Sequence, residues 1–241
     1  MTEMPQTAMV LAAGLGTRMR PLTDETPKPL IPVAGKPLIN YALERFAGAG
    51  VARAIVNVHH LADQVEATMS NVETPEIVIS DERATLLETG GGLKKARSLL
   101  GEAPVFCTNT DAILIDGDGK EACAALADQW DSTRMDALLL LVPSERTSGY
   151  DGYGDFDRSD TGEISLRSGD HAPFVFTGLQ IIAPTLIDKG PSGAFSTRVL
   201  WDMAAENNRL FGVVYEGDWL HVGDPAGLSA AERRLGAAPP A

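Results

Sequence analysis

A glycine-rich turn with nearby cations stands close to the start of the sequence, in Gly14-Leu-Gly-Thr-Arg18-Met-Arg20. It follows an apolar run that ends at Leu11, and the backbone N–H groups of such a turn can point at a phosphate. Arg18 adds a planar guanidinium that fits phosphate oxygens, and Lys28 adds a compact positive charge. The segment lacks the Gly-Lys-Ser/Thr of a Walker loop, and Met19 replaces the third glycine of a dinucleotide-binding fingerprint. We therefore expect an anion site of a different kind.

Charge is spread unevenly along the chain. The 241 residues hold 33 acidic and 20 basic side chains, a net charge of −13. This charge disfavours nucleic acid and anionic lipid membranes as partners. Residues 17–36 nevertheless contain four basic and two acidic side chains, and such a local positive surplus can hold a small polyanion.

Five of the fifteen prolines lie in residues 21–37. Because proline fixes φ and removes a hydrogen-bond donor, we expect a stiff, irregular loop here rather than a helix or a central strand. Long irregular loops inside a compact domain are usually functional. A solvated connector between two elements is the alternative.

Apolar runs alternate with helical patterns through the first 140 residues. Strands are expected at Ala8–Leu11, Arg53–Val58, Glu76–Ser80, Val105–Thr108 and Ala137–Val142. Helices are expected at Leu38–Ala49, Ala62–Met69, Leu93–Leu100 and Glu121–Trp130. This alternation is typical of an α/β protein whose parallel sheet is covered on both faces.

Asp111 stands directly after the strand expected at Val105–Thr108, just as the glycine-rich turn follows the first strand. Ligands of such sheets bind beyond the carboxyl ends of the strands, so we expect both features to share one crevice. The alternative role for Asp111 is that of a helix cap or turn former.

The last 90 residues have a different pattern. A hairpin is expected from Gly154–Asp157 and Glu163–Leu166, followed by strands at Phe174–Ile182, Leu210–Tyr215 and Trp219–Val222 and a helix at Thr197–Glu206. A final helix should have Asp224 as its N-cap and Pro225 as its first residue. We expect one domain with an appended region on the substrate side.

Length and composition narrow the class of protein further. The longest uncharged apolar stretch, Ala137–Val142, is far shorter than the ~18 residues of a membrane span. No leader-like pattern opens the sequence, so a cytoplasmic protein is expected. The two cysteines, Cys107 and Cys123, form neither a disulfide framework nor a zinc site.

The extended motif around the glycine-rich turn resembles that of a known family. Leu11-Ala-Ala-Gly-Leu-Gly-Thr-Arg18 with Pro27-Lys-Pro29 is similar to the signature of the sugar-1-phosphate nucleotidyltransferases, and the likeness continues at Asn109-Thr-Asp111 and Trp219-Leu-His-Val-Gly223. The resemblance implies a Rossmann-like three-layer fold with a mixed, mostly parallel central sheet and a small sugar-side β region. The single domain, residues 1–241, would comprise a nucleotide-binding half (7–142) and a sugar-binding half (143–236).

The resemblance also implies the activity and the site residues. Family members transfer a nucleoside monophosphate from a nucleoside triphosphate onto a sugar 1-phosphate and release pyrophosphate, with Mg²⁺ as cofactor. The implied catalytic residues are Arg18, Lys28 and Asp111, with Asp111 as the metal ligand. The implied nucleotide-binding residues are Ala12, Ala13, Gly14, Gly16, Thr17, Glu88 and Gly91. The implied sugar-binding residues are Asn109, Gly154, Asp155, Thr177 and Gly178.

Two departures from the family pattern bear on metal and sugar. His221 stands where many relatives carry a second metal-binding aspartate, and imidazole is a poor Mg²⁺ ligand. It could bind metal weakly, act through water, or contact phosphate when protonated. Leu166-Arg-Ser-Gly-Asp170 replaces the Glu-Lys-Pro run of hexose-specific relatives.

Other features favour one group within the family. Glu88-Thr-Gly-Gly-Gly92, Phe176-Thr-Gly178 and Gly193-Ala-Phe195 resemble the N-acetylmuramate-1-phosphate uridylyltransferases of cell-wall recycling. An acidic sugar would need a cation, for which Arg167 or Arg198 is the candidate. The alternatives are a GTP-dependent mannose- or heptose-1-phosphate guanylyltransferase and a non-catalytic nucleotide-sugar-binding protein.

Overall fold

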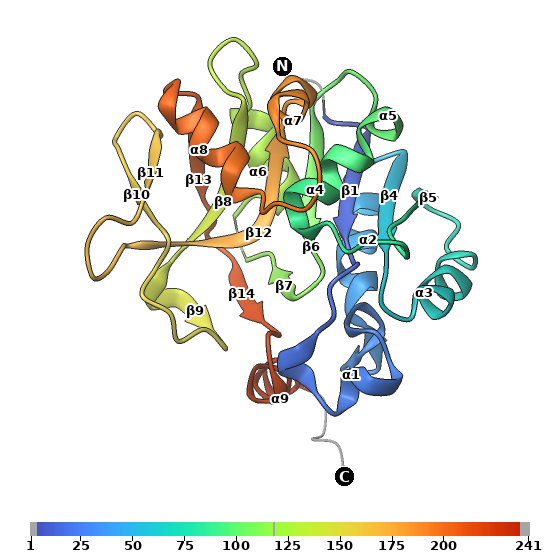
Figure 1. Cartoon of the computed structure of the whole chain (residues 1–241). Helices are drawn as coiled ribbons and strands as arrows, with labels where there is room; N and C mark the ends of the chain where they lie inside the picture. Colours follow the sequence, from blue (N-terminus) through green and yellow to red (C-terminus); the bar gives the residue numbers. More distant parts are fainter. Residues whose placement is uncertain (1–3, 118, 237–241) are drawn as a thin grey trace.

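A mixed sheet of nine strands runs through the described residues, 4–117 and 119–236, of the computed structural model (Figure 1). Its first part is parallel, in the order β6-β1-β4-β5. These four strands are β1 (Thr7–Leu11), β4 (Arg53–Val58), β5 (Glu76–Asp81) and β6 (Val105–Asn109). The nearly continuous apolar stretches of β1 and β4 fit strands that are covered on both faces.

The second part of the sheet is largely antiparallel. β12 (Phe174–Ile182) pairs antiparallel with β6 and with β8 (Ala137–Pro143), and β13 (Leu210–Val214) pairs parallel with β8. The hairpin β10 (Phe156–Arg158) and β11 (Ile164–Leu166) extends the sheet through β12. The predicted mixed sheet and hairpin are confirmed.

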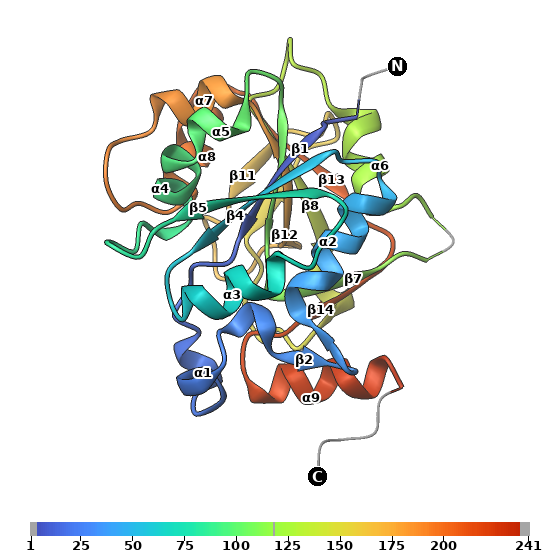
Figure 2. The same cartoon turned by 90° about the vertical axis from the view of Figure 1, so that its right-hand side faces the viewer.

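Helices cover both faces of the sheet and give three layers (Figure 2). One face carries α2 (Leu38–Gly48), α3 (Ala62–Met69) and α6 (Ala122–Gln129), whose apolar residues share one core with β1 and β4. The other face carries α4 (Glu88–Lys95), α5 (Arg97–Leu100), α7 (Pro184–Lys189) and α8 (Arg198–Glu206), which share a second core.

A smaller sheet lies beneath the carboxyl ends of the parallel strands. β14 (Asp218–His221) pairs with β7 (Ala112–Ile115) and β9 (Thr147–Ser148), and α9 (Pro225–Arg234) packs beside it. Its core includes Met19 from the glycine-rich turn and Ile31 and Val33 from the proline-rich segment. The small sheet and α9 therefore pack against the proline-rich segment, which lies beside α9 in Figure 1.

Short elements make up the end of the glycine-rich turn, the proline-rich segment and the connection after β8. These are η1 (Thr17–Met19), α1 (Leu22–Glu25), η2 (Lys28–Leu30), β2 (Pro32–Val33), β3 (Lys36–Pro37) and η3 (Ser144–Arg146). The segment is irregular, as predicted, although it contains the four-residue helix α1.

Local differences from the predicted elements have physical causes. α4 begins at Glu88 rather than Leu93, because close packing holds Gly90–Gly92 in a helix despite their low helix propensity. β7 was not expected, and it exists as the partner of β14. Asp224 caps α9 as predicted: its Oδ1 accepts from Gly227 N–H at 2.8 Å.

Among the described residues, no helix combines the length and the apolar character that crossing a membrane would require.

Candidate active site

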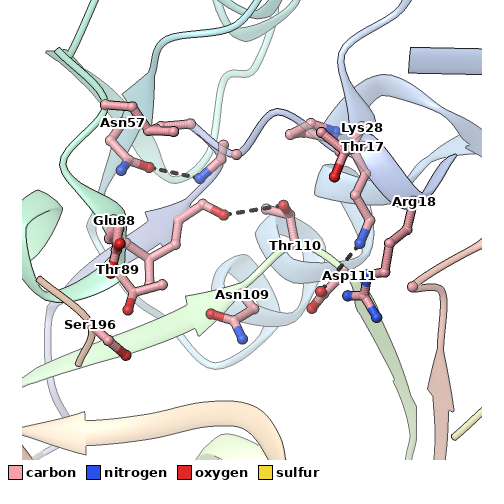
Figure 3. A pocket seen from close by; sticks show the side chains of 18 residues that line it. Thr17, Arg18, Lys28, Asn57, Glu88, Thr89, Asn109, Thr110, Asp111 and Ser196 are labelled. Atoms are coloured by element: carbon pink, nitrogen blue, oxygen red, sulfur yellow. Dashed lines mark hydrogen bonds and ion pairs between the residues drawn. The ribbon is translucent and has the colours of Figure 1, made fainter. Parts of the chain in front are cut away.

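A cavity of about 470 Å³ opens beyond the carboxyl ends of β1, β4 and β6 (Figure 3). The glycine-rich turn and Asp111 both line it, so the predicted shared crevice is confirmed. Its described lining residues are Leu11, Ala12, Ala13, Gly14, Gly16, Thr17, Arg18, Lys28, Pro29, Asn57, Leu86, Glu88, Thr89, Asn109, Thr110, Asp111, Ser196 and Gly223.

The turn after β1 is fixed by contacts with the proline-rich segment. Gly16 has a φ of +62°, and a Cβ there would lie 2.8 Å from Thr23 Cγ2, so a side chain is excluded. The Thr23 hydroxyl donates to the Gly16 carbonyl at 2.9 Å. His60 Nε2–H in turn donates to the Thr23 carbonyl at 2.8 Å, which ties the turn to the region of α3.

The charged end of the cavity contains Lys28, Asp111 and Arg18 (Figure 3). Lys28 Nζ lies 3.2 Å from Asp111 Oδ2. Burial alone would raise the pKa of Asp111, but the charges of Lys28, His221 and Arg18 outweigh it and hold the pKa below its ordinary value. Asp111 is therefore ionised near neutral pH. Arg18 is exposed and makes no ion pair within the described residues, so its guanidinium is available to an anion.

His221 lies next to this charged end. A Cβ on Gly223 would lie 2.2 Å from His221 Nε2 and 3.3 Å from Arg18 Nη1, so both side chains lie against Gly223. Burial lowers the pKa of His221, and Lys28 and Arg18 lower it further, against the opposing effect of Asp111. The neutral imidazole is thus the main form near neutral pH, which argues against contact with phosphate as a cation.

The opposite end of the cavity presents Glu88, Thr89 and Ser196, two of them neutral polar residues (Figure 3). Glu88 begins α4, and the N–H groups of Gly90 and Gly91 donate to the Phe195 carbonyl at 2.8 and 3.0 Å. A Cβ on Gly91 would lie 2.5 Å from the Gly193 carbonyl. Gly91 is therefore packed inside the protein and is not among the described residues that line the cavity.

A second cavity, of about 240 Å³, lies beside the β10–β11 hairpin. Its lining includes the predicted Gly154 and Asp155 together with Arg167, Arg198 and Trp201. Thr177 and Gly178 are buried and line neither cavity in the described chain. The Thr177 hydroxyl donates to the Leu140 carbonyl at 2.9 Å, and a Cβ on Gly178 would lie 3.3 Å from Asn109 Cβ.

Several lining residues escaped the sequence analysis. Asn57 is a polar residue that follows the apolar run Ala54–Val56 near the end of β4, a signal that could have identified it. Thr110 adjoins Asp111, and its hydroxyl donates to the Leu11 carbonyl at 3.2 Å. Gly223 ends the Trp219–Gly223 motif, although no site role was expected for it. Ser196 reaches the cavity only through long-range packing, so no local signal marks it.

Comparisons with known proteins agree with this geometry. The family model described as Nucleotidyl transferase matches residues 7–165. The N-acetylmuramate alpha-1-phosphate uridylyltransferase of Caulobacter vibrioides is 48% identical over 240 residues, covering 98% of this chain and 99% of that protein. The protein of the same name from Neisseria meningitidis is 34% identical, covering 95% and 98%.

Solved structures show the same fold. A UDP-glucose pyrophosphorylase complexed with UDP-glucose has a TM-score of 0.79 at 17% identity, covering 95% of this chain and 98% of its own. The inositol-1-phosphate CTP transferase of T. maritima has a TM-score of 0.78 at 16% identity, covering 99% and 100%. By its family model and its nearly full-length relatives, the chain belongs to the nucleotidyl transferase family, as a sugar-1-phosphate nucleotidyltransferase.

Proposed function

We propose that the chain transfers UMP from UTP onto N-acetylmuramate α-1-phosphate and releases pyrophosphate. The names of the relatives that are 48% and 34% identical support the base and the sugar. The observation that carries the chemistry is one cavity that joins the glycine-rich turn, Lys28 and Asp111. A second cavity with two arginines supports an acidic sugar.

The two ends of the main cavity suit the two ends of a nucleotide. The amides of residues 13–17 and the cations Arg18 and Lys28 would receive the triphosphate. The neutral polar groups of Thr89 and Ser196, with Glu88 beside them, would face the base. Asn109, which lies between these ends (Figure 3), would face the sugar.

The reaction needs no general base, because the attacking phosphate is already ionised near neutral pH. An oxygen of the sugar phosphate forms a bond to the α-phosphorus of UTP, and the bond from that phosphorus to the β-phosphate oxygen breaks. Pyrophosphate leaves with the electron pair. Lys28 would neutralise charge at the α-phosphate, and Arg18 would bind the leaving pyrophosphate. Positioning and charge neutralisation thus carry the catalysis.

The residues present fit a Mg²⁺ ion that arrives with the triphosphate. No group of three His, Cys, Asp or Glu side chains that could hold a metal occurs in the described part of the chain. Mg²⁺ commonly needs only one or two protein carboxylates beside substrate phosphates and waters. The ionised Asp111 would hold it, and the bound ion would neutralise phosphate charge. The neutral His221 would act through a water or as a weak ligand.

The second cavity would hold the acidic part of the sugar. Arg198 Nε lies 3.2 Å from Asp202 Oδ1, and Arg167 Nη1 donates to the Asp170 carbonyl at 2.9 Å. Each guanidinium keeps further N–H donors, and both line the cavity with Trp201. A carboxylate on the substrate would receive charge-assisted hydrogen bonds from them.

The test is pyrophosphate release from each nucleoside triphosphate with a panel of neutral and acidic sugar 1-phosphates in the presence of Mg²⁺. We expect release with UTP and N-acetylmuramate 1-phosphate. Release with GTP alone would overturn the uridylyl assignment in favour of a mannose- or heptose-phosphate guanylyltransferase. No release from any pair would favour a nucleotide-sugar-binding protein without turnover.

A further inference from the structure

A buried carboxylate, Glu82, lies behind the main cavity at the end of β5. Its residue is 0% exposed, and no cation forms an ion pair with it in the described chain. Burying a carboxylate away from water is costly unless hydrogen bonds compensate. The hydrogen bonds of Glu82 must therefore offset this cost.

The two carboxylate oxygens of Glu82 accept from two different elements beside the cavity. Oε1 accepts from Asn57 Nδ2 at 2.8 Å, and Oε2 accepts from the N–H of Leu87 at 3.3 Å. Leu87 is the residue directly before α4. The Leu87 carbonyl accepts from Phe195 N–H at 3.1 Å, which continues the connection to the loop that carries Ser196.

Asn57 continues the connection to the glycine-rich turn. Its Oδ1 accepts from the Ala12 N–H at 2.7 Å (Figure 3). Because Glu82 can only accept, it forces the Asn57 amide to present its nitrogen to Glu82 and its oxygen to Ala12. The orientation of one buried side chain thus fixes the backbone from which the phosphate-binding turn starts.

Gly92 makes room for this pair. A Cβ at Gly92 would lie 2.8 Å from Asn57 Nδ2 and 2.9 Å from Glu82 Oε1. The third glycine of the run in α4 therefore leaves space for the Asn57–Glu82 contact, whereas Gly90 and Gly91 leave space for residues 193–195.

We infer that Asn57 and Glu82 are positioning residues, which hold the phosphate-binding turn and the start of α4 at a fixed separation and so set the fit of the nucleoside triphosphate. The part of this inference that concerns the triphosphate rests on the proposed function. The part that concerns the two backbone segments does not.

A donor–acceptor swap tests the inference. In Glu82→Gln alone, every orientation of the two amides sets one donor against another, and in Asn57→Asp alone two carboxylates meet. In the double variant Asn57→Asp/Glu82→Gln, Gln Nε2 donates to one Asp oxygen, the other Asp oxygen accepts from Ala12 N–H, and Gln Oε1 accepts from Leu87 N–H. All three hydrogen bonds return with the net charge unchanged.

The readouts are hydrogen exchange, measured without substrate, and steady-state kinetics. We expect each single variant to speed exchange in residues 8–19 and 83–95 together, and to raise KM for the nucleoside triphosphate at least tenfold. KM for the sugar 1-phosphate should change less than twofold. The swap should restore both readouts to within threefold of wild type. The matched control Asn208→Asp/Glu206→Gln, made at the exposed end of α8, should change neither.

The inference would be overturned if the single variants exchanged at wild-type rates. It would also be overturned if the swap recovered exchange and KM no better than the worse single variant. If the swap restores the exchange rates but no variant changes the kinetics, the pair stabilises the fold only. Its role in positioning the triphosphate would then be overturned. Failure of the proposed function would give a different result. Exchange would change in the single variants and recover in the swap, but the wild-type enzyme would show no turnover with UTP. If a single variant does not fold, Gly92→Ala tests the same contact from the other side.

Discussion

Lys28 is the side chain on which the proposed chemistry depends most. It lies 3.2 Å from Asp111 and lines the cavity with the phosphate-binding turn. Lys28→Ala removes the positive charge beside the α-phosphate, and we expect kcat to fall by at least two orders of magnitude, as for loss of one transition-state charge contact. Lys36→Ala is the matched control, because Lys36 lies in the same segment but pairs with Glu44. A near-wild-type rate for Lys28→Ala would remove the proline-rich segment from the reaction centre.

His221 tests how the metal is held. We expect Asp111→Ala to abolish turnover, because it removes the ionised carboxylate proposed as the metal ligand. His221→Asp should keep or raise turnover and lower the Mg²⁺ concentration needed for half-maximal rate, because it adds a carboxylate where the neutral imidazole is a poor ligand. The measurement is a Mg²⁺ titration of initial rate. An inactive His221→Asp enzyme would show that the imidazole has a role that a carboxylate cannot fill.

At the scale of elements, the predictable parts of the site are those with a local sequence signal. The turn after β1 and Asp111 after β6 each follow a buried strand, so their shared position was accessible from topology. Glu82 also follows a strand, but nothing local shows that its side chain is buried against Asn57. Ser196 has no such signal, because its place depends on packing between elements far apart in the sequence. The start of α4 was hidden because three consecutive glycines argue against a helix, and only their close contacts compensate.

The junction of four elements around Asp116 gives a stability test at the same scale. Arg45 of α2 bonds Asp116 and Glu121, and the Tyr215 hydroxyl donates to Asp116 Oδ1 at 2.7 Å. Burial alone would raise the pKa of Asp116, but the hydrogen bonds from Tyr215 and Arg45 outweigh it and lower the pKa. A carboxyl with a lowered folded pKa stabilises the protein above its unfolded pKa of about 3.9, and this contribution is lost as pH falls.

We therefore expect Tyr215→Phe to destabilise the protein by about 1.5–3 kcal/mol at pH 7, the usual range for a hydrogen bond to a charged group. The difference from wild type should shrink as pH falls from about 4, where the unfolded carboxyl becomes protonated, through the lower pKa of folded Asp116. Urea unfolding at a series of pH values measures both effects. Tyr153→Phe is the control, because Tyr153 is 61% exposed. Equal stability of Tyr215→Phe and wild type at pH 7 would contradict the role of this junction.

At the scale of the whole molecule, the two cavities lie on one sheet, so a ligand in either cavity should stabilise the entire fold. Thermal unfolding of variants can therefore assign each ligand to its cavity. A ligand at 100 times its Kd adds about 2.7 kcal/mol, which raises Tm by roughly 5–11 °C for a domain of this size. Lys28→Ala should reduce the Tm shift caused by UTP with Mg²⁺, because the triphosphate loses a cation. Arg198→Ala should keep that shift but lose most of the shift caused by the acidic sugar 1-phosphate, because Arg198 lines only the second cavity among the described lining residues. Loss of both shifts in Arg198→Ala would mean that the two cavities do not bind the two substrates separately.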